Sequence, residues 1–226
     1  KQFQYWPVSS IALYALRNNI LPLSLNTWYK YVNKFGLAKV KPPSRSKQRE
    51  ISVRAERPHQ IWHADITQFV TGDNVRHYVY LVVGNFCRKI RKNVTPHGPG
   101  VTLITDGGPE NNLKDFLAAP GQTIEHRIAL VDVHYSNSMI EAHNKIVKYN
   151  YLYRMNIYDG EHLRKIFPSI VENFNNRPHV SLDGLTPSEA EQSLLLNREQ
   201  LRIYTAEATG ERQKYNRINQ CSHCKA

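Results

Sequence analysis

The sequence predicts a mixed α/β domain in which a sheet is flanked by helices, and three observations predict it. Strand patterns come first: residues 61–70 alternate, the turn-forming TGDN follows, and residues 75–83 are rich in Val and Tyr. The run VTLIT at 101–105 is short and apolar, as expected of a strand buried on both faces. Helical patterns follow at 138–154 and 161–176. Strands followed by helices around a buried central strand are typical of layered α/β domains.

Shorter patterns predict the remaining elements of this domain. FCRKI at 86–90 and TIEHRIAL at 123–130 predict further strands, and LKDFLAA at 113–119 predicts a helix. Thr186 and Glu189 have the spacing of a capping box around Pro187, which predicts a short helix there. The tail at 194–226 is polar and basic, and its pattern allows a helix or an irregular chain.

The charge of the chain indicates its class of partner. Lys and Arg number 30 against 19 Asp and Glu, a net charge of +11. Such an excess favours polyanions, and nucleic acid comes first among them. We expect no membrane association, because no apolar run approaches the roughly 18 residues that a span needs. Three cysteines favour a reducing compartment over a disulfide framework.

Residues 1–38 predict two short helices. The first covers 9–19 with a serine cap, and the second covers 24–36, capped by Ser24 or Asn26 and ended by Gly36. A helix-turn-helix would place the start of the second helix on base edges. A helical hairpin with a solvated basic face fits this stretch equally well. In the first interpretation, the DNA-contacting residues are Asn26, Thr27 and Lys30.

Residues 39–57 form a basic, proline-containing linker. The pattern predicts contact with DNA phosphates, although a linker that is merely solvated is the alternative. The candidate phosphate contacts are Lys39, Lys41, Arg45, Lys47 and Arg49.

The cysteines predict no complete metal site. Cys221 and Cys224 form a CxxC that is half of a zinc site, and no second CxxC exists in the sequence. A loose tail, or ligands shared between chains, is the favoured interpretation, and Cys87 is most simply a core residue.

Three acids are notable for their positions. Asp65 lies inside an apolar strand pattern, Asp106 ends VTLIT before two glycines, and Glu141 begins a helical pattern. Each has an ordinary explanation when taken singly. Asp65 could face solvent and Asp106 could form an Asx turn. Glu141 could close a capping box or form an ion pair one turn along its helix.

Taken together, the three acids indicate a metal site. Adjacent central strands would bring Asp65 and Asp106 side by side, and a helix packed across the sheet could deliver Glu141. Three converging carboxylates repel one another unless a hard cation such as Mg²⁺ neutralises them. Two such ions can activate a water or a 3′-hydroxyl and stabilise the leaving oxygen of a phosphodiester.

Four blocks in this order carry a resemblance to a known family: WHADITQF, LITDGGPENN, SNSMIEAHNKIVK and NNRPHVSLDGLTPSEA. They resemble the catalytic core of bacterial insertion-sequence transposases, within the retroviral-integrase superfamily. The resemblance covers residues 58–193, followed by a basic tail at 194–226. The 34 residues between Asp106 and Glu141 are close to the family's spacing.

The resemblance implies a ribonuclease H-like fold with a five-stranded mixed sheet, and a DDE triad. Asp65, Asp106 and Glu141 would be the catalytic residues and the ligands of two Mg²⁺ ions, for which Mn²⁺ can substitute. The helix face that follows Glu141 would meet the DNA end, through Asn144, Lys145 and Lys148. Arg177 to His179 resemble a family signature whose role here we expect to be structural.

The resemblance also implies an activity, partners and a location. We expect a transposase or integrase that cleaves the ends of a mobile element and joins the 3′-hydroxyl to target DNA. Its partners would be double-stranded terminal repeats and target DNA, bound by a homo-oligomer in the bacterial cytoplasm at the nucleoid. A nuclease of this fold without strand transfer, and a catalytically silent transposase-derived DNA-binding protein, are the alternatives.

The sequence departs from the family in two places. Only 41 positions separate Asp65 from Asp106, where the family places a longer third strand and a helix. Either the protein is trimmed or residues are missing between Ile90 and Val101, and we favour the second because losing that helix would uncover one sheet face. Gly84 and Cys87 stand where relatives commonly carry Asp and Ser.

Overall fold

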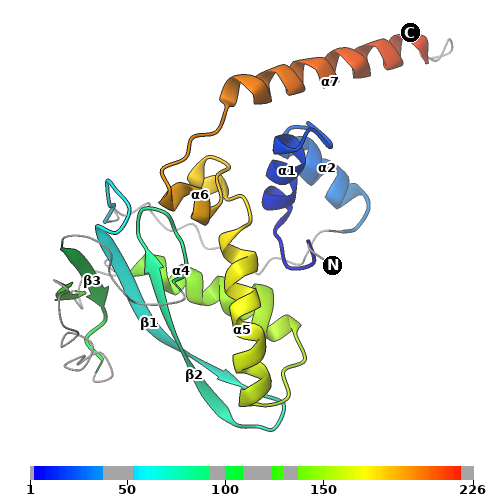
Figure 1. Ribbon diagram of the computed structural model, residues 1–226. Coiled ribbons are helices and arrows are strands. Elements are labelled where there is room, and N and C mark those ends of the chain that lie inside the picture. The colour runs from blue at the N-terminus through cyan, green and yellow to red at the C-terminus, as the bar shows by residue number, and fades with distance from the viewer. Residues whose placement is uncertain (1–2, 38–52, 92–99, 109–123, 130–136, 220–226) are drawn as a thin grey trace.

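The structure is a computed structural model that describes residues 3–37, 53–91, 100–108, 124–129 and 137–219. Its centre is a mixed sheet with the order β2-β1-β3-β4. The strands are β1 (Ile61–Val70), β2 (Arg76–Gly84), β3 (Val101–Thr105) and β4 (Ile124–Ile128). The helices are α1 (Val8–Arg17), α2 (Leu25–Lys34), α4 (Ser138–Ile146), α5 (Gly160–Asn175), α6 (Pro187–Glu191) and α7 (Arg198–Ile218). Figure 1 shows their arrangement.

The sheet combines one antiparallel pair with parallel neighbours. β1 pairs with β2 as an antiparallel hairpin from Trp62 opposite Gly84 to Val70 opposite Arg76. β3 lies parallel to β1, with His63 opposite Ile104, and β4 lies parallel to β3. Four predicted strands are therefore confirmed, and their ends differ from the prediction by no more than two residues. These are the strands predicted at 61–70, 75–83, 101–105 and 123–130.

The predicted fifth strand at 86–90 is reduced to one bridge. Within the described residues, only Ile90 pairs, opposite Val83 at the outer edge of β2. Arg88 has a φ of 59°, which interrupts extended backbone just before that bridge. The expected five-stranded sheet is thus four-stranded in the described part, while most of the interval from Ile90 to Val101 and the predicted helix at 113–119 lie outside it.

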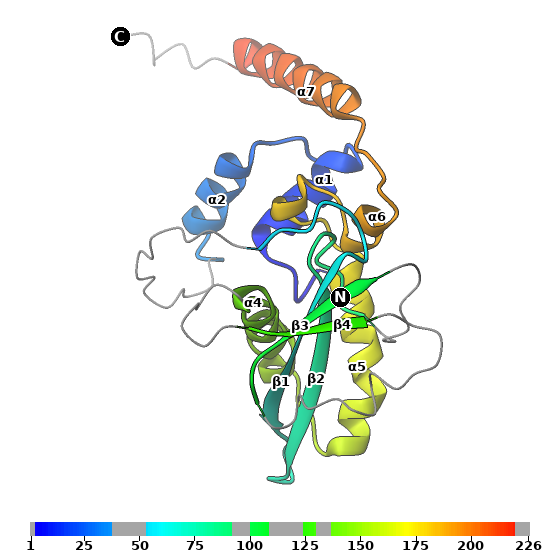
Figure 2. The ribbon, with the colours of Figure 1, turned by 90° about the vertical axis from the view of Figure 1, so that its left-hand side faces the viewer.

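Residue alternation along β1 separates two packed faces. His63, Asp65, Thr67 and Phe69 point to one face, where Leu81 and Val83 of β2 pack with buried residues of α4 and α5 in the main core. Trp62 points to the other face, into a smaller apolar cluster with Val82 and Leu103. Figure 2 views the sheet with α4 and α5 behind it. The helix-bearing face is therefore the one that Asp65 shares.

The long helix predicted at 138–154 forms with a change of helical type. α4 continues into a π-helical turn, η2 (Val147–Tyr151), and then into a 3-10 turn, η3 (Leu152–Arg154). Tyr151 at the end of the π-helical turn and Leu152 at the start of the 3-10 turn are both fully buried in the core. π-turns recur at functional sites, and this one directly follows the helix that carries Glu141.

The N-terminal helices are attached to the sheet domain through α1. Trp6 donates from Nε1 to Asn173 Oδ1 at 2.9 Å, and the Ser10 hydroxyl donates to the Pro178 carbonyl at 2.6 Å. Arg17 binds both carboxylate oxygens of Glu189, at 3.0 and 2.5 Å. The expected serine cap of the first helix is wrong, because Pro7 occupies the N-cap position and Ser10 is used in this packing.

The other predicted caps are confirmed. Ser24 caps α2 by accepting from the Thr27 amide, and Gly36 follows the helix with a φ of 64°, in the left-handed region that glycine tolerates. Thr186 and Glu189 form the predicted capping box of α6. Most of the described part of the tail is helical, since α7 covers Arg198–Ile218, and this helix extends beyond the rest of the molecule (Figure 1).

The packing around residue 84 accounts for the glycine that stands where relatives commonly carry Asp. A Cβ at residue 84 would lie 2.9 Å from Cys87 Sγ. Cys87 is buried, as expected of a core residue. The sulfur therefore occupies the space that any side chain at position 84 would need. Cys221 and Cys224 lie outside the described residues.

Within its described residues, the structure contains no helix long and apolar enough to cross a membrane.

Candidate functional site

Asp65 lies in the middle of β1, on the face covered by helices. Its neighbour across the hairpin is the buried Leu81, so the carboxylate enters a partly apolar layer. The backbone amide of Ile66 donates to Oδ1 at 2.8 Å, and Asn144 Nδ2 of α4 donates to Oδ2 at 2.6 Å. Both carboxylate oxygens are engaged, which excludes the explanation that Asp65 is an ordinary solvent-facing strand residue.

Asp106 follows the last residue of β3 and reaches the same level as Asp65. His63 pairs with Ile104 in the parallel register, and each acid lies two residues further along its own strand. Two residues of strand advance about 6.6 Å and return the side chain to the same face. The sheet therefore places Asp65 and Asp106 side by side, as the sequence predicted.

Glu141 lies in the first turn of α4 and is exposed. α4 begins at Ser138 after the N-cap residue Asn137, so Ser138 and Glu141 do not have the positions of a capping box. Lys145 forms no ion pair with Glu141 in the described part of the chain. Neither local explanation for Glu141 therefore holds.

The three acids interact electrostatically, and the effect is seen in the pKa of Asp65. Burial, together with the negative charges of Asp106 and Glu141, raises the pKa of Asp65 to about 6. The hydrogen bonds from Ile66 and Asn144 oppose this rise. The hydroxyl of Tyr80 is affected in the same direction, since burial and the charges of Asp65 and Asp106 raise its pKa to about 12. The acids of β1, β3 and α4 thus concentrate negative charge around Asp65.

The donor chemistry of this cluster fits a hard divalent cation. Carboxylate oxygens are the ligands that Mg²⁺ takes, and a dication would relieve the repulsion that raises the pKa of Asp65. The side-chain oxygen of Asn144 is buried and accepts no hydrogen bond from the part of the chain that the structure describes, which adds a further oxygen beside Asp65. Within the described residues, however, no three Asp, Glu, His or Cys side chains close around a single point.

The predicted DNA-contacting residues fall into three groups. Asn144 bonds to Asp65, while Lys145 is exposed and Lys148 is half-buried in η2. On α2, Asn26 and Lys30 are exposed, whereas Thr27 is half-buried and its hydroxyl lies 2.9 Å from that of Ser24. The third group, Lys39, Lys41, Arg45, Lys47 and Arg49, lies outside the described residues.

The Arg177–His179 segment is structural, as expected. Arg177 is fully buried, with its guanidinium 4.7 Å from the ring centroid of Phe174 and bonded to the Tyr151 hydroxyl at 3.1 Å. His179 is also held in the core, where burial lowers its pKa to about 3. Neither side chain takes part in the carboxylate cluster.

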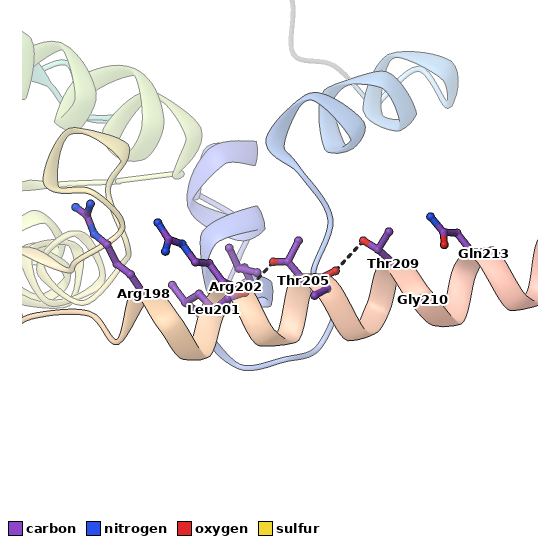
Figure 3. Close-up of a pocket in the computed structure, with 9 residues that line it drawn as sticks. Arg198, Leu201, Arg202, Thr205, Thr209, Gly210 and Gln213 are labelled. Atoms are coloured by element: carbon purple, nitrogen blue, oxygen red, sulfur yellow. Dashed lines mark hydrogen bonds between the residues drawn. The ribbon is translucent and has the colours of Figure 1, made fainter.

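A groove of about 690 Å³ lies away from the carboxylates, between α1 and α7. Leu16 contributes from α1, and one face of α7 contributes Arg198, Leu201, Arg202, Thr205, Ala206, Thr209, Gly210 and Gln213. The two threonine hydroxyls donate back to carbonyls of their own helix (Figure 3). Among the described residues that line it there is no Asp, Glu, His or Cys.

Sequence reasoning missed a buried polar group beside the carboxylates. His63 and Asn85 are almost fully buried, and their side chains are 2.8 Å apart. His63 also contacts Asn137, the N-cap residue of α4, at 3.2 Å. Burial lowers the pKa of His63, so the ring is neutral near pH 7. The period of two along the strand could have found it, because His63 shares a face with Asp65.

Comparison with solved structures gives a likeness to a chain in the cryo-EM structure of the simian T-cell lymphotropic virus intasome bound to the PP2A regulatory subunit B56 gamma. The TM-score is 0.52 at 18% identity, over 77% of this chain and 69% of that chain. The likeness shows a shared fold. Both chains therefore build a mixed sheet flanked by helices.

A second solved structure is the catalytic core domain of HTLV-2 integrase with magnesium, in a dimeric form. Its TM-score is 0.45 at 15% identity, over 61% of this chain and 99% of that chain. No protein-family model and no curated protein matches the sequence.

Proposed function

We propose that this protein is a DDE transposase or integrase that cleaves DNA ends and transfers them to target DNA. The observation that carries the proposal is the approach of acids from three separate elements, β1, the end of β3 and the start of α4, which raises the pKa of Asp65. The fold shared with an intasome chain and the net charge of +11 support it. Carboxylates assembled in this way on a basic protein suit metal-assisted phosphodiester chemistry.

Asp65, Asp106 and Glu141 would hold two Mg²⁺ ions, for which Mn²⁺ can substitute. When bound, the ions lower the pKa of an attacking water or 3′-hydroxyl and neutralise charge on the leaving oxygen. Asn144 orients the Asp65 carboxylate through its 2.6 Å hydrogen bond. Lys145 and Lys148, on the same helical segment, would attract the phosphates of the DNA end toward the acids.

The remaining basic residues would bind DNA away from the reacting phosphate. The linker at 39–57 would follow the phosphate backbone, and α2 would present Asn26, Thr27 and Lys30 to base edges. Double-stranded terminal repeats and target DNA would then be the partners. We further propose a homo-oligomer assembled on DNA, acting at the bacterial nucleoid, since two element ends must be joined to one target.

The test uses labelled duplexes with randomised terminal base pairs, a supercoiled plasmid as target and Mg²⁺. The proposal predicts labelled plasmid, which reports strand transfer, together with shortened label, which reports end cleavage. Shortened label without labelled plasmid would show the nuclease alternative. Retarded duplex with neither product would show a DNA-binding protein that is catalytically silent.

A further inference from the structure

Two buried polar side chains connect the end of the linker to the start of α4. The Asn85 side chain donates from Nδ2 to the Val53 carbonyl at 3.0 Å and accepts the Ala55 amide on Oδ1 at 2.8 Å. The orientation of this amide is fixed, because a flip would set an oxygen against the Val53 carbonyl and an NH₂ against the Ala55 amide. Asn85 also donates from Nδ2 to His63 Nε2 at 2.8 Å.

These contacts determine the tautomer of His63. Since Asn85 Nδ2 donates to it, Nε2 is the acceptor nitrogen, and the ring proton lies on Nδ1. Nδ1 then donates to Asn137 Oδ1 at 3.2 Å. His63 is 2% exposed and Asn85 is 4% exposed, so neither can exchange these partners for solvent. Each hydrogen bond from the linker through Asn85 and His63 to Asn137 therefore joins one donor to one acceptor.

Asn137 connects this chain of hydrogen bonds to the catalytic helix. Asparagine at an N-cap usually accepts a backbone amide of the first turn on its side chain, yet Asn137 makes no such bond. Its side-chain oxygen accepts from His63 instead, while its backbone carbonyl accepts the Glu141 amide at 3.4 Å. The Asn137 side chain thus bonds to His63 of β1 and does not cap the first turn of α4.

α4 is consequently attached to β1 at two points. His63 holds the residue before the helix, and Asp65 binds Asn144 two turns later. The two strand residues lie on one face, two positions apart. Two attachments fix both the rotation of α4 about its axis and its position along β1, whereas one attachment would leave the exposed first turn free to shift. Glu141 lies between them.

We propose that His63, supported by Asn85, is a positioning residue that holds the start of α4 so that Glu141 faces Asp65 and Asp106. The inference rests on the proposed function, because the group being positioned is an acid of the proposed active site. Positioning errors of about 1 Å can lower a rate about a hundredfold. Loss of this contact should therefore affect turnover more than DNA binding.

The test compares four variants of the full chain. His63→Leu removes both hydrogen bonds, and His63→Gln retains an amide that can donate to Asn137 and accept from Asn85. Asn137→Ala removes the acceptor at a half-buried position where folding is least at risk. His179→Leu is the matched control, a buried histidine that contacts the Phe174 carbonyl outside the carboxylate cluster. Amide hydrogen exchange of residues 139–142 and strand-transfer kinetics are measured for each.

The proposal predicts exchange at 139–142 about tenfold faster in His63→Leu and Asn137→Ala, as loss of one hydrogen bond implies, with partial recovery in His63→Gln. The kcat of strand transfer should fall at least about tenfold in both while KM for DNA stays within about twofold. His179→Leu should lower the melting temperature without faster exchange at 139–142 and without the loss of kcat.

Unaltered exchange at 139–142 in Asn137→Ala, or equal changes in the control, would overturn the proposal. An inactive wild-type protein would refute the proposed function while the exchange measurement still decides the positioning role.

Discussion

The folded protein opposes the negative charge of Asp65. Its pKa is raised to about 6 by burial and by the neighbouring acids, above the ordinary value of 3.8. A carboxyl whose folded pKa is raised binds its proton more tightly in the folded state than in the unfolded state. Its contribution to stability is therefore favourable below about pH 4 and is lost as pH rises through about 6. At pH 7.5 the metal-free protein carries the full penalty.

Removing this charge should stabilise the metal-free protein. We predict that Asp65→Asn raises the melting temperature at pH 7.5 without divalent metal by roughly 2–4 °C, after discounting the shift for partial exposure to about 1 kcal/mol. Asp73→Asn is the matched control, because hydrogen bonding by Thr71 lowers the pKa of Asp73 and its charge is favourable. A lower melting temperature in Asp65→Asn would contradict the electrostatic account of the site.

The same titration should control metal binding. Because Asp65 is protonated below about pH 6, we predict that the rise in melting temperature caused by Mg²⁺ is present at pH 7.5 and disappears as pH falls through about 6. Differential scanning calorimetry with and without Mg²⁺ at a series of pH values measures this directly, with Asp65→Asn as the reference that shows little response at any pH. A pH-independent Mg²⁺ response would place the metal elsewhere.

At the scale of elements, local chemistry and long-range packing differ in how well the sequence predicts them. The α2 and α6 caps and the hairpin turn were predictable because their partners lie within three or four residues. The first helix begins earlier than predicted, with Pro7 at its N-cap, and Ser10 instead bonds Pro178, which is distant in sequence. The π-turn and the reduction of the strand at 86–90 to one bridge also depend on distant packing. No local sequence pattern predicts the π-turn or the single bridge.

The proposed recognition helix α2 gives an element-scale prediction. Asn26 is exposed in its first turn, so it can reach base edges without disturbing the Ser24 cap. We predict that Asn26→Ala changes sequence preference, measured by selection from randomised duplexes, more than it changes non-specific affinity. Lys30→Ala is the companion variant and should weaken binding to all sequences alike. If Asn26→Ala leaves preference unchanged, the helical-hairpin interpretation is the better one.

At the scale of the whole molecule, the net charge of +11 should make DNA affinity fall steeply with salt. We predict that replacing Lys39, Lys41, Arg45, Lys47 and Arg49 by Gln reduces the slope of log K against log salt by nearly one unit per lost phosphate contact. α7 offers a matched control set, since Arg198, Arg202 and Lys214 already pair with acids. Fluorescence anisotropy at a series of salt concentrations measures both slopes. Equal slopes in the linker variant and the wild-type protein would show that the linker does not touch DNA.

The three acids were predictable from the sequence, although their support was not. Asp65 interrupts an apolar strand pattern and Asp106 ends another, and adjacency of the two strands, which the structure shows to be parallel, makes them neighbours. The buried chain from Asn85 to Asn137 joins residues more than 50 positions apart, so no spacing rule could predict it. The sequence therefore predicts the grouping of the three acids more readily than the contacts that hold them in position.

The central claim is that these acids act together as a metal-binding catalytic group, and Asp106→Asn tests it most directly. Asparagine keeps the size and the turn preference of Asp106 and removes only the charge. Glu141→Gln makes the same change on α4, and Asp159→Asn, which keeps the cap of α5, is the matched control. Strand transfer with Mg²⁺ should fall at least about a hundredfold in the first two variants and stay near wild type in the control. All three should bind end DNA as the wild-type protein does. If Asp106→Asn or Glu141→Gln retains most of its strand-transfer activity, the assignment of the three acids is wrong.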